Sequence, residues 1–210
     1  MDLDKARVIA IVGDVDSCKT SVAFNLLNNY KGKRDKALYC YPNRTLPYRY
    51  IDSLNVLAQL ENTIIVIDEF QLHFPIYSNR MASAKLFDLI SLSRHKNVTL
   101  ILTTQNSQNL PRQLENFFDG YILTHIAHLK LIKHAGLIKE IVNDIYTSPF
   151  VNRISETLDL KKGEYYQMLK DQDDNGFKTF INPNIKKDWC GITRTNSLDE
   201  YKEIKIKVNN

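Results

Sequence analysis

The sequence has 210 residues, of which 43% are hydrophobic and 25% charged, as expected for one globular domain with a substantial core. The net charge of +4 is small, so it permits a polyanionic partner without requiring one. No apolar run approaches the roughly 20 residues that span a bilayer, and residues 1–5 do not resemble a secretory signal, so we expect an intracellular protein. The three cysteines, Cys18, Cys40 and Cys190, are too scattered for a disulfide framework or a zinc site.

Apolar runs typical of strands alternate with segments of helical periodicity through about residue 125. This alternation predicts the α/β class, with a mostly parallel central sheet and helices on both faces, because crossover helices join parallel strands. In chain order we expect strand 8–12, helix 21–29, strand 37–41, helix 50–60, strand 63–67, helix 81–93, strand 98–103, helix 112–117 and strand 121–124.

The pattern weakens beyond residue 125, but one hairpin signal stands out. Asp173-Asp174-Asn175-Gly176 lies between two strand-like runs, 164–169 and 177–181, which predicts a C-terminal β-hairpin. We therefore divide the chain into a core at 1–150 and an extension at 151–210 that packs on the core or on a neighbouring subunit. We assign no function to residues 183–210.

The turn between the first strand and the first helix carries a phosphate-binding pattern. Gly13-Asp14-Val15-Asp16-Ser17-Cys18-Lys19-Thr20 has the glycine, lysine and threonine spacing of a P-loop. Backbone N–H groups at a helix N-terminus wrap a polyphosphate, the lysine reaches the β and γ phosphates, and the threonine hydroxyl binds Mg²⁺. We therefore predict that the nucleotide is bound by Gly13, Asp14, Val15, Asp16, Ser17, Cys18, Lys19, Thr20 and Ser21, with Thr20 on the metal.

One position of this loop departs from the pattern. Cys18 stands where the second glycine belongs, and Asp14 and Asp16 place negative charge beside a negative ligand. A cysteine is small enough to turn away from the phosphates, and Asp16 tolerates left-handed backbone better than most residues. We therefore expect this departure to affect the hydrolysis of ATP more than its binding.

Two carboxylates follow the most apolar predicted strand, at the edge where α/β sheets bind ligands. Asp68 is predicted to bind Mg²⁺, directly or through water, and Glu69 to polarise the attacking water. Gln105 ends the next strand, where it can sense the γ-phosphate. A P-loop with this acidic pair and a separate polar-ended strand is typical of additional-strand, RecA-like P-loop NTPases. The sequence has no NKxD-type guanine motif, which favours ATP.

These motifs resemble the HerA-FtsK superfamily of DNA-pumping ATPases over residues 7–125. The more specific likeness lies in Asp68-Glu69-Phe70-Gln71 with His73-Phe74-Pro75, and in Leu92-Ser93-Arg94-His95-Lys96-Asn97 before a strand that closes on Thr104-Gln105. Within this superfamily, the short chain resembles the Zot-like proteins and the genome-packaging ATPases of tailless icosahedral archaeal viruses.

The resemblance implies ATP and Mg²⁺ as cofactors, with Lys19, Glu69 and Gln105 as catalytic residues and Asp68 on the metal. It implies a hexameric or pentameric ring that pumps double-stranded DNA, with capsid or portal components as further partners. The implied location is the cytoplasm of a host cell, or the virion. Ring ATPases complete each site with a neighbour's arginine. Arg94 is the first candidate, ahead of Arg80 and Arg112, although a cation at a helix C-terminus explains Arg94 equally well.

Two other functions remain open. The first is a nucleotide-binding assembly or adaptor protein, whose P-loop, altered at Cys18, would bind ATP without hydrolysing it. The second is a small-molecule kinase: Asp68-Glu69-Phe70-Gln71 is similar to a segment of thymidine kinase, but the cysteine pairs of that family's zinc lobe are missing here. Two candidate DNA contacts also have structural explanations, of which the first is favoured over DNA binding and the second is equal to it. They are the aromatic and basic stretch from Tyr39 to Tyr50, which core packing explains, and the cationic run Lys130, Lys133, His134 and Lys139, which a solvated helix face explains.

Overall fold

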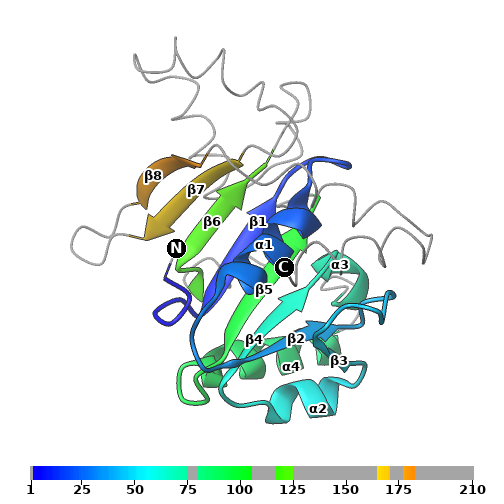
Figure 1. Ribbon diagram of the computed structural model, residues 1–210. Coiled ribbons are helices and arrows are strands. Elements are labelled where there is room, and N and C mark those ends of the chain that lie inside the picture. The colour runs from blue at the N-terminus through cyan, green and yellow to red at the C-terminus, as the bar shows by residue number, and fades with distance from the viewer. Residues whose placement is uncertain (1, 75–79, 106–116, 125–164, 171–176, 183–210) are drawn as a thin grey trace.

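The computed structural model describes residues 2–74, 80–105, 117–124, 165–170 and 177–182 (Figure 1). Its strands are β1 (Val8–Val12), β2 (Asp35–Tyr39), β3 (Arg49–Ile51), β4 (Thr63–Ile67), β5 (Thr99–Thr104), β6 (Gly120–Leu123), β7 (Tyr165–Lys170) and β8 (Phe177–Asn182). They form a sheet in the order β3-β2-β4-β5-β1-β6-β7-β8. The pairings from β3 through β6 are parallel, and β7 and β8 are antiparallel. The predicted mostly parallel sheet is therefore confirmed.

The place of β5 in the sheet decides the fold class. β5 lies between β1, which precedes the P-loop, and β4, which precedes the acidic pair. This inserted strand defines the additional-strand P-loop NTPase fold, so that prediction is confirmed. The C-terminal hairpin is also confirmed, because β7 pairs with β8 and its other edge joins β6. The domain boundary at residue 150 lies outside the described residues and stays a prediction.

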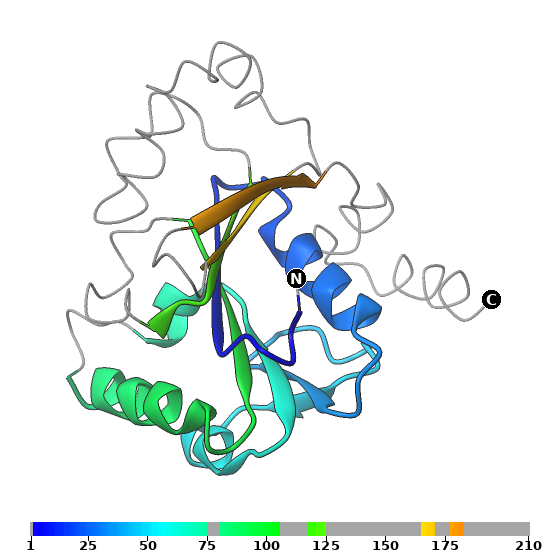
Figure 2. The same ribbon diagram turned by 90° about the vertical axis from the view of Figure 1, so that its left-hand side faces the viewer.

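Helices cover both faces of the sheet (Figure 2). They are α1 (Lys19–Asn29), α2 (Leu54–Gln59), α3 (Phe70–His73) and α4 (Arg80–Ser93). Alternate residues of β1 point to opposite faces, as strand geometry requires. Val8, Ala10 and Val12 join the core cluster of α2, α3 and α4, whereas Ile9 and Ile11 join that of α1. All five β1 residues are therefore fully buried, which is why the strand is continuously apolar.

The predicted helix at 50–60 begins later than expected. Arg49–Ile51 forms β3 and pairs with Ala37–Tyr39 of β2, and the helix starts only after Ser53, whose backbone is extended. Hydrogen bonding to the sheet edge thus overrides helical periodicity in this segment. The predicted helix at 112–117 lies almost wholly outside the described residues.

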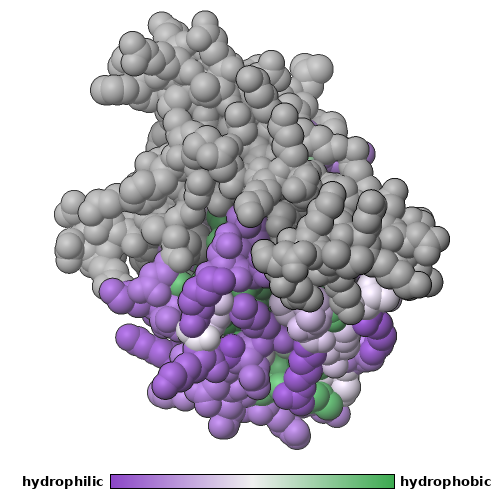
Figure 3. Space-filling model, in the orientation of Figure 1, coloured by the Kyte–Doolittle hydropathy of each residue, from purple (hydrophilic) through white to green (hydrophobic). Residues whose placement is uncertain are grey.

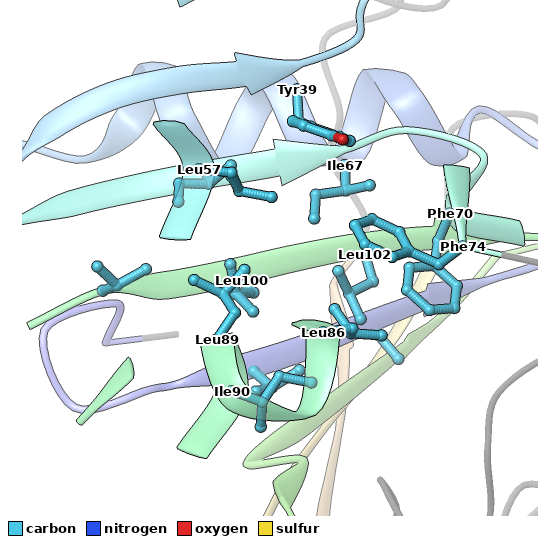
Figure 4. Packing of buried hydrophobic residues seen from close by; sticks show 14 of the residues in the cluster. Tyr39, Leu57, Ile67, Phe70, Phe74, Leu86, Leu89, Ile90, Leu100 and Leu102 are labelled. Carbon is cyan, nitrogen blue, oxygen red and sulfur yellow. The ribbon is translucent and has the colours of Figure 1, made fainter. Parts of the chain in front are cut away.

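A four-residue helix, α3, follows the acidic pair and was not predicted. Phe70 begins α3 and Phe74 follows its last residue; both are buried, with their ring centroids 5.4 Å apart and their planes nearly parallel. Tyr39 of β2 stacks on Phe74 at 5.8 Å, and Figure 4 shows both phenylalanines beside Ile67 and Leu102 in the core. This aromatic cluster anchors the segment directly after Asp68 and Glu69.

The surface of the described residues in Figure 3 is predominantly hydrophilic. Among the described residues, the exposed large apolar side chains are Val15, Val56, Leu72 and Leu92. In the part of the chain that the structure describes, no helix is both long and apolar enough to cross a membrane.

Candidate nucleotide site

Three parallel strands deliver the predicted site residues to one edge of the sheet (Figure 1). The register pairs Val12 of β1 with Thr104 of β5, and Ile67 of β4 with Leu102. The residues that follow β1, β4 and β5 therefore emerge side by side at the carboxyl edge, where α/β sheets bind ligands. The P-loop, the acidic pair and Gln105 are brought together in this way.

The P-loop backbone is left-handed at two residues that are not glycine. Asp16 has a φ of 63° and Cys18 a φ of 67°. The left-handed region costs a residue with a Cβ about 1–2 kcal/mol, and aspartate bears it better than most. Cys18 occupies the N-cap position of α1 with a buried side chain, so its thiol is turned away from solvent. Cys18 therefore adopts the left-handed backbone conformation that a glycine at this position would adopt without strain.

Gly13 is required by a close approach. A Cβ on Gly13 would lie 1.8 Å from Thr124 Oγ1 and 2.5 Å from Ser17 Oγ. Those two hydroxyls are themselves hydrogen-bonded at 2.6 Å, which ties the P-loop to the segment after β6. Thr124 was not among the predicted site residues, although a threonine closing the strand at 121–124 was the available signal.

Lys19 is held inside the loop. Its Nζ donates to the main-chain oxygen of Asp14 at 2.7 Å and lies 3.9 Å from Glu69 Oε1. Burial lowers the pKa of Lys19, and the carboxylates of Glu69 and Asp68 oppose that shift. The ammonium is thus placed between the phosphate-binding loop and the acidic pair.

Thr20 and Asp68 form the predicted metal site. Thr20 Oγ1 donates to Asp68 Oδ1 at 2.8 Å, and Thr103 Oγ1 donates to the same oxygen at 2.7 Å. Burial raises the pKa of Asp68, while the two hydroxyl donors oppose that shift. The described residues contain no group of three or more His, Cys, Asp or Glu side chains placed to hold a metal ion by themselves. One hydroxyl and one carboxylate fit Mg²⁺, which usually keeps waters and nucleotide phosphates as its other ligands.

Glu69 has partners on both carboxylate oxygens. Gln105 Nε2 donates to Oε1 at 2.9 Å, and Gln71 Nε2 donates to Oε2 at 2.5 Å. The Glu69 backbone is left-handed, with a φ of 46°, and its N–H donates to Thr103 Oγ1 at 2.8 Å. No role was predicted for Gln71 or Thr103. The spacing of residues along the chain does not reveal contacts between segments that only the fold brings together.

Arg94, the first candidate for the neighbour's arginine, is not part of this cluster. Arg94 is exposed after the end of α4 and precedes β5, so it lies at the opposite end of the sheet from Gln105. Arg80 begins α4, and Arg112 lies outside the described residues, as do Lys130, Lys133, His134 and Lys139. The assignment of Arg94 to a neighbour's site stays a prediction.

Packing accounts for most of the aromatic stretch between Tyr39 and Tyr50. The Tyr41 ring meets the Phe24 ring of α1 edge-on, with 5.2 Å between the ring centroids. The Tyr48 ring stacks on the same Phe24 ring, with 6.1 Å between the centroids. Burial raises the pKa of Tyr48 to about 12. Arg44 pairs with Asp52 at 2.5 Å. The structural explanation of this stretch is therefore favoured over base stacking.

Comparison with known families supports the resemblance. Residues 43–142 match the family described as zonular occludens toxin (Zot). No curated protein matches the sequence.

Solved structures match over most of the chain. The genome packaging NTPase B204 from Sulfolobus turreted icosahedral virus 2 in complex with ATP-gammaS has a TM-score of 0.57 and 16% identity, covering 88% of this chain and all of that one. The pCW3 conjugation coupling protein TcpA with ATPgS has a TM-score of 0.55 and 13% identity, covering 99% of this chain and 66% of that one. The resemblance to Zot-like proteins and viral packaging ATPases is confirmed, and at these identities the structures establish the shared P-loop NTPase fold.

Proposed function

We propose that this protein hydrolyses ATP and uses the energy to translocate double-stranded DNA, as a viral genome-packaging ATPase of the HerA-FtsK type. The observation that carries the proposal is the meeting of Lys19, Glu69 and Gln105 beside the hydroxyl and carboxylate of Thr20 and Asp68. A nucleotide-binding protein without turnover has no use for a water-activating carboxylate in this place.

The proposed chemistry assigns each group one task. Lys19 exchanges its bond to the Asp14 carbonyl for the β and γ phosphates. Mg²⁺, held by Thr20 and Asp68, would supply positive charge to the phosphate oxygens. Glu69 accepts a proton from the attacking water as the water oxygen bonds to the γ-phosphorus and the bond to the ADP oxygen breaks. Gln105, exposed at the end of β5, contacts the γ-phosphate.

The coupling to DNA rests on likeness and on the placement of Arg94. B204, whose whole length this chain covers in the comparison, is described as a DNA-packaging ATPase. Because Arg94 is exposed and remote from the site of its own chain, we assign it to a neighbour's site in a hexameric or pentameric ring. We place such a ring in the host cytoplasm or the virion, with capsid or portal components as partners.

Steady-state ATP hydrolysis with and without double-stranded DNA tests this function, with Glu69→Gln as the matched control. We expect hydrolysis that DNA stimulates, that falls steeply with added salt, and that Glu69→Gln reduces at least 100-fold while ATP still binds. Equal hydrolysis by the wild type and Glu69→Gln would overturn the proposal.

Cys18 favours one second candidate, an assembly protein that binds ATP without turnover. Its strained backbone sits in the loop that must wrap the phosphates. Single-turnover measurements separate the two functions. One ATP hydrolysed per site supports the motor, and tight binding with no product in wild type and Cys18→Gly alike supports the assembly protein.

A further inference from the structure

Glu69 is held by two glutamines that differ in how firmly they are fixed. Gln105 is exposed at the end of β5, whereas Gln71 is half-buried on α3 and directly follows the buried Phe70 in the chain. A carboxylate accepts hydrogen bonds and does not donate them, so the Gln71 atom 2.5 Å from Glu69 Oε2 must be its NH₂ group. The orientation of the Gln71 amide therefore follows from the chemistry of its partner.

The other end of the Gln71 amide shows what fixes it. Gln71 Oε1 is buried and has no hydrogen-bond partner in the described part of the protein. A buried acceptor without a partner costs free energy, so this conformation is kept for the bond that the NH₂ group makes. That NH₂ group donates to Glu69 Oε2.

We propose that Gln71 is a positioning residue for the reaction, which holds the Glu69 carboxylate in place while Gln105 leaves it for the γ-phosphate. Glu69 needs such a support because its backbone is left-handed and its side chain is a quarter exposed. With Gln71 on Oε2, the lone pairs of Oε1 become available to the attacking water when Gln105 departs. This inference rests on the proposed ATPase function for its kinetic consequence, and on geometry for the contact itself.

Two variants of Gln71 separate the hydrogen bond from packing. Gln71→Met keeps the length of the side chain and removes the donor, and Gln71→Glu keeps the shape and replaces the donor with an oxygen that repels Glu69. The matched control is Leu72→Ala, because Leu72 is the next residue of α3 and is 72% exposed. Thermal unfolding of each variant checks that α3 still folds.

Kinetics give the first readout. We expect kcat for ATP to fall about 10- to 100-fold in Gln71→Met and further in Gln71→Glu, with KM unchanged within about twofold, while Leu72→Ala matches the wild type. The split between kcat and KM distinguishes positioning of Glu69 from general damage to the nucleotide site. An unchanged kcat in Gln71→Met, or a KM that rises by the same factor, would overturn the proposal.

A second readout does not need turnover. In ¹H–¹⁵N spectra, the side-chain amide of Gln71, identified by its loss in Gln71→Met, should resonate downfield of a free glutamine and return to the free position in Glu69→Ala. A free position in the wild type would overturn the proposal. A wild type that hydrolyses no ATP would defeat the proposed function alone, because the spectrum still decides whether Gln71 holds Glu69.

Discussion

The two ends of the parallel sheet both bury polar side chains, but they use them differently. At the carboxyl end, carboxylates, hydroxyls and Lys19 surround Glu69, and four residues have left-handed backbones: Asp16, Cys18, Cys40 and Glu69. The left-handed residues at the amino end are Asn62 and Asn97, and asparagine tolerates that conformation better than most residues. At the amino end, Arg34 donates to Thr99 Oγ1 at 2.8 Å and to the main-chain oxygen of Leu3, and pairs with Asp4 at 3.2 Å.

The polar groups at the carboxyl end form a candidate nucleotide site, whereas those at the amino end hold the structure together. The Arg34 guanidinium is satisfied by groups that are already in place, and it ties the N-terminal segment to the starts of β2 and β5. The carboxyl end instead leaves Gln71 Oε1 without a partner among the described residues and keeps strained backbone beside the P-loop. Unsatisfied and strained groups gather where function is expected. We therefore expect variants at the amino end to change stability alone, and variants at the carboxyl end to bear on the nucleotide site as well.

The largest loss of stability is expected at the amino end. Arg34→Met removes the buried guanidinium that donates to the Leu3 carbonyl and the Thr99 hydroxyl, so the free energy of unfolding should fall by about 3 kcal/mol. Urea unfolding measures the change. ATP binding by the folded fraction should match the wild type, and a weakened nucleotide affinity would show that the two ends are not independent.

Gly13→Ala should damage stability and nucleotide binding together. The added Cβ would overlap the hydroxyls of Thr124 and Ser17, so we expect a loss of about 2 kcal/mol and weaker ATP binding. Thermal unfolding and nucleotide titration measure the two effects. Adding Thr124→Ala should restore part of the stability by making room, and no recovery in the double variant would contradict the steric explanation.

Cys18→Gly should do the reverse, because it relieves strain within the site. Glycine adopts a φ of 67° without penalty, so the unfolding free energy should rise by about 1 kcal/mol and turnover should not fall. Differential scanning calorimetry tests the first effect. A lower melting temperature would mean that packing of the buried thiol outweighs the strain.

The smallest effect concerns Tyr48, which packs beside α1 and belongs to neither polar cluster. Burial raises its pKa from 10 to about 12, so its stabilising contribution is complete below pH 10 and is lost as the pH rises towards 12. Because Tyr48 is partly exposed, we expect that loss to be less than about 1 kcal/mol. Tyr48→Phe should flatten the stability curve over this range, and an identical slope in the variant would show that Tyr48 does not ionise there.

Much of the fold was predictable, because a continuous apolar run in the sequence indicates a strand that is buried on both faces. The predicted runs at 8–12 and 63–67 coincide with β1 and β4, since strands covered on both faces are continuously apolar. β3 was missed because three residues at a sheet edge have no periodicity of their own. α3 was missed because its anchor is the stacking of Phe70, Phe74 and Tyr39, a contact between distant segments.

The sequence by itself determined the P-loop spacing, the acidic pair at a strand end and the α/β class, because each depends on residues that are neighbours in the chain. Only the tertiary structure decided that Thr103 bonds Asp68, that Thr124 crowds Gly13 and that Gln71 and Gln105 share Glu69. It also decided that Arg94 lies away from its own site. The physical reason is the order of the parallel strands, which sets which strand ends become neighbours and which reach opposite edges of the sheet.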